Sequence, residues 1–70
     1  MKFEIGKFYK HTTGLQFSIL AEITTTMRGD GLVAETNNAN EEITTVGKSE
    51  SAAENFTEIS EDEWMKNFSE

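Results

Sequence analysis

A run of alternating side chains between residues 15 and 27 constrains the fold of this chain more than any other feature of its sequence. Every second position of these 13 residues is apolar or a threonine, in the series Leu15, Phe17, Ile19, Ala21, Ile23, Thr25 and Met27. A period of two is typical of a long β-strand with one face buried and the other in water. The β-branched stretch that begins at Ile23 favours the same structure. We therefore predict a strand from Leu15 to Met27.

Turn sequences on both sides of this strand divide the first two thirds of the chain. A turn over 11–14 ends at Gly14, where a positive φ is tolerated, and Asp30-Gly31 is typical of a tight hairpin. A second turn is predicted over 37–40 from its asparagines. Between these turns we expect four strands: 7–11, 15–27, 32–36 and 42–46.

The last third of the chain contains two Ser-x-x-Glu sequences, which are typical of helix starts. The second predicts a short C-terminal helix over 61–68, with Trp64 and Phe68 on one face. For residues 51–59 the pattern permits either one helix or a helical turn over 51–54 followed by a strand over 55–59. We favour the strand, because Phe56 to Ile59 is rich in β-forming residues. The fold class expected is mainly β: one domain over 1–70, a small five-stranded bent antiparallel meander of SH3-like barrel type with a C-terminal helix.

Charge is unevenly distributed along the chain. Its 70 residues include 6 Lys+Arg and 13 Asp+Glu, for a net charge of −7, and residues 1–40 carry four of each. The whole excess therefore lies in residues 41–70. A negative balance argues against non-specific binding to nucleic acid or to an anionic membrane. With no Cys and one His we expect neither a metal nor a cofactor, and the lack of an apolar leader at the start predicts a cytoplasmic protein.

Nothing in the sequence singles out a catalytic centre. His11 is the only candidate proton shuttle, and Gly47-Lys48-Ser49 lacks the upstream glycines of a phosphate-binding loop. A 70-residue barrel also has little volume for a pre-formed pocket, so we do not expect an enzyme. Arg28-Gly29-Asp30 matches an integrin-binding tripeptide, but we interpret it as a turn. The glycosylation sequons at 55–57 and 67–69 are interpreted as chance matches.

One acidic segment has two interpretations. The acids of residues 50–63 have no base among residues 49–65: Glu50, Glu54, Glu58, Glu61, Asp62 and Glu63. Such a run is usually a solvated face, and it can also be a surface that binds a basic partner as a nucleic-acid mimic does. Trp64 either closes the core or anchors an interface. The candidates for a protein-interaction surface are Glu54, Glu58, Glu61, Glu63 and Trp64.

Three stretches of the chain resemble small barrel proteins encoded by phages and prophages of Gram-positive bacteria. They are Gly6-Lys7-Phe8-Tyr9-Lys10-His11 with Gly14, Gly31-Leu32-Val33-Ala34-Glu35, and Phe56-Thr57-Glu58-Ile59 before an acidic helix that contains tryptophan. Ala53-Glu54-Asn55-Phe56 is similar to a stretch of the phage Thoeris anti-defence sponges. Asn55 and Phe56 stand where that family has Asp and Trp.

The resemblance to sponge proteins implies a non-enzymatic anti-defence protein that sequesters a nucleotide-type immune signal at an oligomer interface in the host cytoplasm. Tyr9 and His11 would then contact the base, Arg28 and Lys48 would hold phosphate, and Ser49 and Asn55 would add polar contacts. The alternative is an acidic inhibitor that binds a host defence protein. A homo-oligomer is expected in either case, because a chain of this size has several large aromatic side chains to bury.

Overall fold

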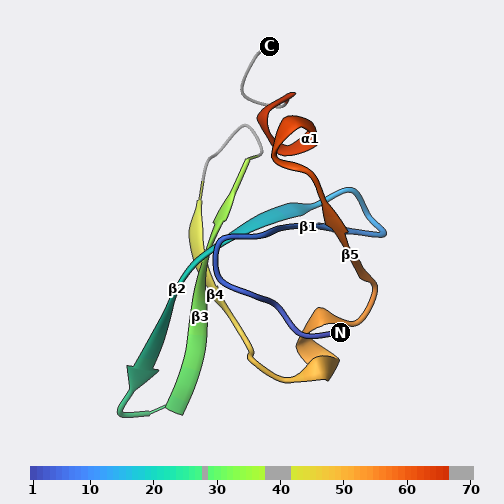
Figure 1. Cartoon of the computed structure of the whole chain (residues 1–70). Helices are drawn as coiled ribbons and strands as arrows, with labels where there is room; N and C mark the ends of the chain where they lie inside the picture. Colours follow the sequence, from blue (N-terminus) through green and yellow to red (C-terminus); the bar gives the residue numbers. More distant parts are fainter. Residues whose placement is uncertain (28, 38–41, 67–70) are drawn as a thin grey trace.

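The computed structural model describes residues 1–27, 29–37 and 42–66, which form a mainly β protein with one antiparallel sheet and one short helix (Figure 1). The elements are β1 (Phe8–His11), β2 (Gln16–Thr25), β3 (Gly29–Thr36), β4 (Ile43–Val46), the 3₁₀ helix η1 (Glu50–Ala53), β5 (Phe56–Ile59) and α1 (Glu61–Met65). The five predicted strands are confirmed, as is the choice of a helical turn and a strand for residues 51–59. The helix predicted over 61–68 is confirmed as far as Met65, and residues 67 and 68 lie outside the described part.

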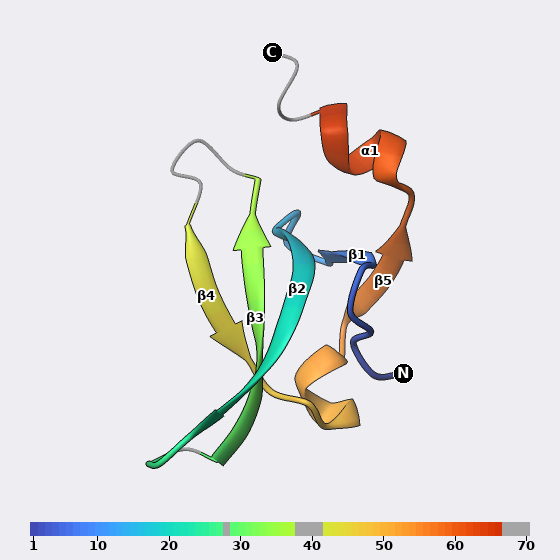
Figure 2. The same ribbon diagram turned by 60° about the vertical axis from the view of Figure 1, so that its left-hand side comes forward.

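The sheet is open rather than closed into a barrel. Its strand order is β4-β3-β2-β1-β5, because β5 returns to pair with β1 and aligns Phe8 with Ile59. All four pairings are antiparallel. Figure 2 shows β4 on one side of the protein and β5, with η1 and α1, on the other. The five-stranded antiparallel arrangement is as expected, but the SH3-like barrel is not confirmed, since β4 and β5 remain as edges.

The main core lies on one face of this bent sheet. Its buried members are Phe3, Tyr9, Phe17, Ile19, Leu32, Ala34 and Ala53, with Val46, Ala52 and Phe56 packed against them. The Phe56 ring lies 5.0 Å from the Phe3 ring and 5.5 Å from the Phe17 ring. The alternation of β2 thus predicted the inward direction of Phe17 and Ile19 correctly.

The other face of β1 and β2 is covered by α1. Trp64 is buried there against Phe8, with the two ring centroids 5.4 Å apart. Beside this contact the buried amide of Asn37 donates to Gln16 Oε1 at 2.7 Å and to the Trp64 carbonyl at 2.9 Å. The first half of β2 is therefore buried on both faces, whereas the sequence predicted a strand with one face in water. Gln16 and Ser18, expected on the polar face, are both buried.

The second half of β2 leaves the core. A register shift between Ile19 and Ala21 marks a β-bulge, and beyond the pair of Glu22 and Leu32, where β4 ends, β2 and β3 continue as a two-stranded ribbon. Ala21 is exposed and Met27 is 93% exposed. The predicted inward positions of these two residues are wrong, and the strand runs from Gln16 to Thr25 rather than from Leu15 to Met27. Alternation distinguishes the faces of a strand but does not say where the core beneath it ends.

Among the described residues, no helix has the length and apolar character needed to cross a membrane.

Candidate functional site

Tyr9, predicted to contact a nucleotide base, is a core residue. It lies in the middle of β1 with 1% of its surface exposed, and its ring edge packs on Phe3 at 5.0 Å. Its hydroxyl accepts a hydrogen bond from the backbone N–H of Glu4 at 2.8 Å. Burial raises the pKa of this phenol above its ordinary value, although the bond from Glu4 partly offsets the effect. Tyr9 thus fastens the N-terminal segment over the core.

His11 and Asn55 are brought together at the end of the β1–β5 ladder. The carbonyl of Asn55 accepts from the Thr12 N–H at 3.1 Å, and Asn55 itself has a positive φ of 69°. The His11 ring lies 4.9 Å from the Phe56 ring, and its Nδ1 is 2.8 Å from the Thr13 hydroxyl. Asn55 is therefore a turn residue that aligns β5, and His11 covers the rim of the core beside it.

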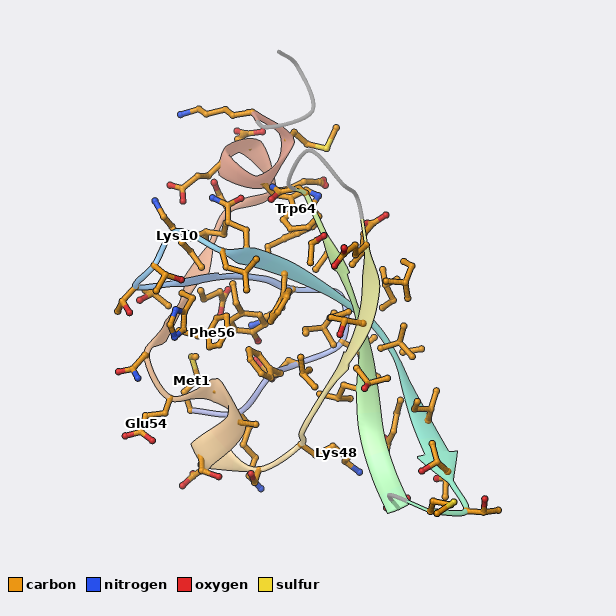
Figure 3. The ribbon with its side chains drawn as sticks, turned by 180° about the vertical axis from the view of Figure 1, so that it is seen from behind. Met1, Lys10, Lys48, Glu54, Phe56 and Trp64 are labelled. Atoms are coloured by element: carbon orange, nitrogen blue, oxygen red, sulfur yellow. The ribbon has the colours of Figure 1, made fainter. Side chains whose placement is uncertain are left out.

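Lys48 and Ser49 follow β4, on the opposite edge of the sheet from β5 (Figure 3). The Lys48 ammonium donates a hydrogen bond to the Glu22 carboxylate of β2 and forms an ion pair with it. This hydrogen bond is the main cause of the raised pKa of Lys48, and the negative charge of Asp30 makes a smaller contribution. Ser49 shares a hydrogen bond of 2.9 Å with the Ser51 hydroxyl at the start of η1. Arg28, the other predicted phosphate ligand, lies outside the described residues.

A groove of about 570 Å³ lies at the free end of the β2–β3 ribbon, against the end of β4. It is lined in part by Ile23, Thr25, Gly31, Thr45 and Val46. Gly31 leaves the space open, because a Cβ atom there would meet only the Val46 carbonyl at 3.4 Å. None of the five described candidates for nucleotide binding lines this groove. Sequence reasoning missed it, because it depends on how far β2 and β3 continue beyond the end of β4.

The acidic residues of the last third belong to η1, β5, α1 and the residue after η1, and these elements lie on one side of the protein (Figure 2). We call this set the acidic side: Glu50, Glu54, Glu58, Glu61, Asp62 and Glu63. All of them are exposed except Glu63, which is half-buried. Figure 3 shows Glu54 pointing away from the protein, whereas Phe56 points inward.

Lys7 is the one cation that contacts the acidic side within the described ranges. Its ammonium lies 3.5 Å from Glu58 and 3.1 Å from Glu4, and the hydrogen bond to Glu4 is the main cause of the raised pKa of Lys7. The remaining carboxylates of the acidic side have no ion pair in the described part of the chain. Trp64, proposed with them as an interface anchor, is only 3% exposed, and its indole packs on Phe8 on the face of the sheet opposite the main core.

No group of three or more potential metal-ligating side chains comes together within residues 1–27, 29–37 and 42–66. Comparison of the chain with family models, with curated proteins and with solved structures found no match.

Proposed function

We propose that this chain is a non-catalytic binding protein whose acidic side docks on a basic segment of another protein. The observation that carries the proposal is that five exposed carboxylates belong to elements on a single side of the protein, and that Glu58 alone of the five is paired with a cation among the residues described. Uncompensated charge of one sign attracts a partner of the opposite sign and speeds its association.

The edge of β5 gives this surface backbone groups that a partner can use. The Asn55 carbonyl faces β1, as its bond from the Thr12 N–H shows, so the backbone groups of Phe56 and Glu58 alternate outward. An extended peptide could therefore add to the sheet beside β5 by main-chain hydrogen bonds, a common mode of peptide recognition. Basic side chains on such a peptide would meet Glu54, Glu58 and Glu61.

The likeness to phage proteins makes a host defence protein the first class of partner to consider, and the chain would then act as its inhibitor. The acidic side needs no nucleotide and no metal for this role. Trp64 contributes indirectly, because it holds α1 and its carboxylates against the sheet.

A peptide of eight alternating lysine and threonine residues is a suitable probe, with binding followed by NMR at low and at physiological salt. Shifts are expected along β5 and α1. Affinity should fall with salt, and the triple variant Glu58→Gln, Glu61→Gln, Glu63→Gln should bind about tenfold more weakly, since each exposed pair contributes less than about 1 kcal/mol. The matched control is Glu22→Gln, Asp30→Asn, Glu35→Gln, which removes the same charge from β2 and β3. Equal loss in the two triple variants, or salt-independent binding, contradicts the proposal.

A second candidate, sequestration of a nucleotide-type signal, is favoured by the groove. Its volume of about 570 Å³ falls in the range of small-molecule sites. Met27, Gly29 and Gly47 also line it, and these residues are the sequence neighbours of Arg28 and Lys48. A site here would not use Tyr9, His11 or Asn55, because none of them lines the groove. Asp30, which also lines the groove, opposes an anion.

Thermal melting with cyclic dinucleotides and cyclic ADP-ribose isomers tests this candidate. A ligand at 100 times its dissociation constant stabilises the folded state by about 2.7 kcal/mol, which is a large shift for a small domain. The Gly31→Val variant, which places a side chain in the groove, should reduce the shift, whereas Thr57→Val on β5 should not. The absence of a shift with every nucleotide contradicts the candidate.

A further inference from the structure

The two edges of the sheet differ in charge. β5 contains Glu58 and is flanked by Glu54 and Glu61, so a second copy of the chain that paired there would place like charges together. β4 consists of Ile43, Thr44, Thr45 and Val46, which are all β-branched and uncharged. Natural edge strands are usually protected from pairing by charge, proline or a bulge, and the four residues of β4 have none of these.

The backbone of β4 offers hydrogen-bonding groups at alternate residues. The Glu42 carbonyl accepts from the Thr36 N–H at 2.8 Å, so Glu42 faces β3. In an antiparallel ladder the direction alternates, so Thr44 and Val46 also bond to β3, while the N–H and C=O groups of Ile43 and Thr45 point away from it. No other described segment runs along that outer side of β4 (Figure 2).

We propose that two copies of this chain associate through β4, in antiparallel pairing about a two-fold axis at Thr44. In this register Ile43 of each copy faces Thr45 of the other, so all the outward-facing groups of the strand find partners. The result is one continuous sheet of two chains. This inference stands independently of the proposed function, because it uses the edge opposite the acidic side.

The side chains also suit this register. Two-fold pairing of antiparallel strands aligns side chains of the same face, so Thr44 meets Thr44 of the second copy, a favourable cross-strand pair. Ile43, which is 62% exposed, gains contact with Thr45 of the other copy, a residue that lines the groove. Glu42 of one copy lies opposite Val46 of the other, near the end of the other copy's β4 that leads to Lys48. No like charges therefore meet along the paired strands.

Light scattering and sedimentation of the whole chain test the association. We expect a mass of twice 7.9 kDa as the concentration rises toward about 1 mM. Thr45→Pro removes an outward N–H without breaking a bond to β3, so it should raise the dissociation constant at least about tenfold. Thr45→Val keeps that N–H and should dimerise as the parent does. A parent chain that remains monomeric, or a folded Thr45→Pro variant that dimerises equally well, overturns the proposal.

Cross-linking tests the register, since the chain has no cysteine of its own. Thr44→Cys should oxidise to a disulfide dimer, because directly opposed residues lie within disulfide reach. Thr45→Cys should not, because the two copies of residue 45 are diagonal and roughly 7–8 Å apart. Preferential cross-linking at residue 45 overturns the register. In the parent chain, the amides of Ile43 and Thr45 should gain protection from hydrogen exchange as concentration rises, and no gain at either amide contradicts pairing at this edge.

Discussion

At the scale of single residues, Tyr9 shows how one side chain can serve the core and a turn together. Its ring packs among the core aromatics, and its hydroxyl receives the Glu4 N–H, so the chain before β1 is held over the sheet. The sequence placed Tyr9 correctly on β1 beside His11 but assigned it to a binding edge. Period two says which residues share a face, and it does not say which face meets solvent.

Replacing Tyr9 by Phe should lower the free energy of unfolding by about 1 kcal/mol at pH 7, because the Glu4 N–H loses its acceptor. The variant should also lose less stability at alkaline pH than the parent. The pKa of Tyr9 is raised in the folded state, so its contribution is complete below the unfolded value of about 10 and is lost as pH rises through the folded value. Urea denaturation of both proteins between pH 8 and 11 measures the difference. Parallel pH dependences would show that Tyr9 does not cause the alkaline loss.

At the scale of elements, the turn sequences made the strands predictable. A hairpin between β2 and β3 is present as predicted, but its turn is not at Asp30-Gly31: these two residues belong to β3, opposite Thr24 and Ile23. The β-forming residues of Phe56–Ile59 correctly favoured a strand over a helix. Local sequence could not indicate the bulge after Ile19 or the bond from Asn37 to Gln16, which lie 21 residues apart and depend on how the strands meet. Of the predicted nucleotide site, only the proximity of His11 to Asn55 and of Lys48 to Ser49 can be recognised in the structure.

The start of α1 depends on a single cap. The Ser60 hydroxyl accepts a hydrogen bond from the Glu63 N–H at 3.1 Å. Ser60→Ala should reduce stability by about 1 kcal/mol, whereas Ser60→Asn, which can cap as well as serine, should cost little. Thermal melts followed by circular dichroism give the values. If the two variants are equally destabilised, the hydroxyl bond is not what the helix start requires.

At the scale of the whole molecule, the two edges of the sheet differ in charge: β4 contains no charged residue, whereas β5 belongs to the acidic side. The net charge is −7, and the exposed ion pairs in the described part involve only Lys7 and Lys48. Exposed pairs contribute little to stability, whereas repulsion among the carboxylates of the acidic side acts over its whole length. The uncharged edge at β4 suits pairing with a second copy of the chain, and the acidic edge at β5 suits a basic partner.

Sodium chloride should therefore stabilise the folded chain, because it screens repulsion more than it weakens the three ion pairs. Raising the salt from 0.01 to about 0.5 M should increase the melting temperature by roughly 4–8 °C, which corresponds to about 1 kcal/mol for a domain of this size. Scanning calorimetry at a fixed, low protein concentration separates this effect from dimerisation. A melting temperature that falls with salt would mean that the ion pairs dominate.

The burial of Trp64 against Phe8 has a practical consequence. It is the only tryptophan, and it lies across β1 from the core cluster around Tyr9. Its fluorescence thus reports the local environment of α1, while the far-ultraviolet signal reports the sheet. If emission shifts to the red at a lower temperature than the sheet melts, the last helix detaches first, and the chain itself carries the optical probe that distinguishes the two events.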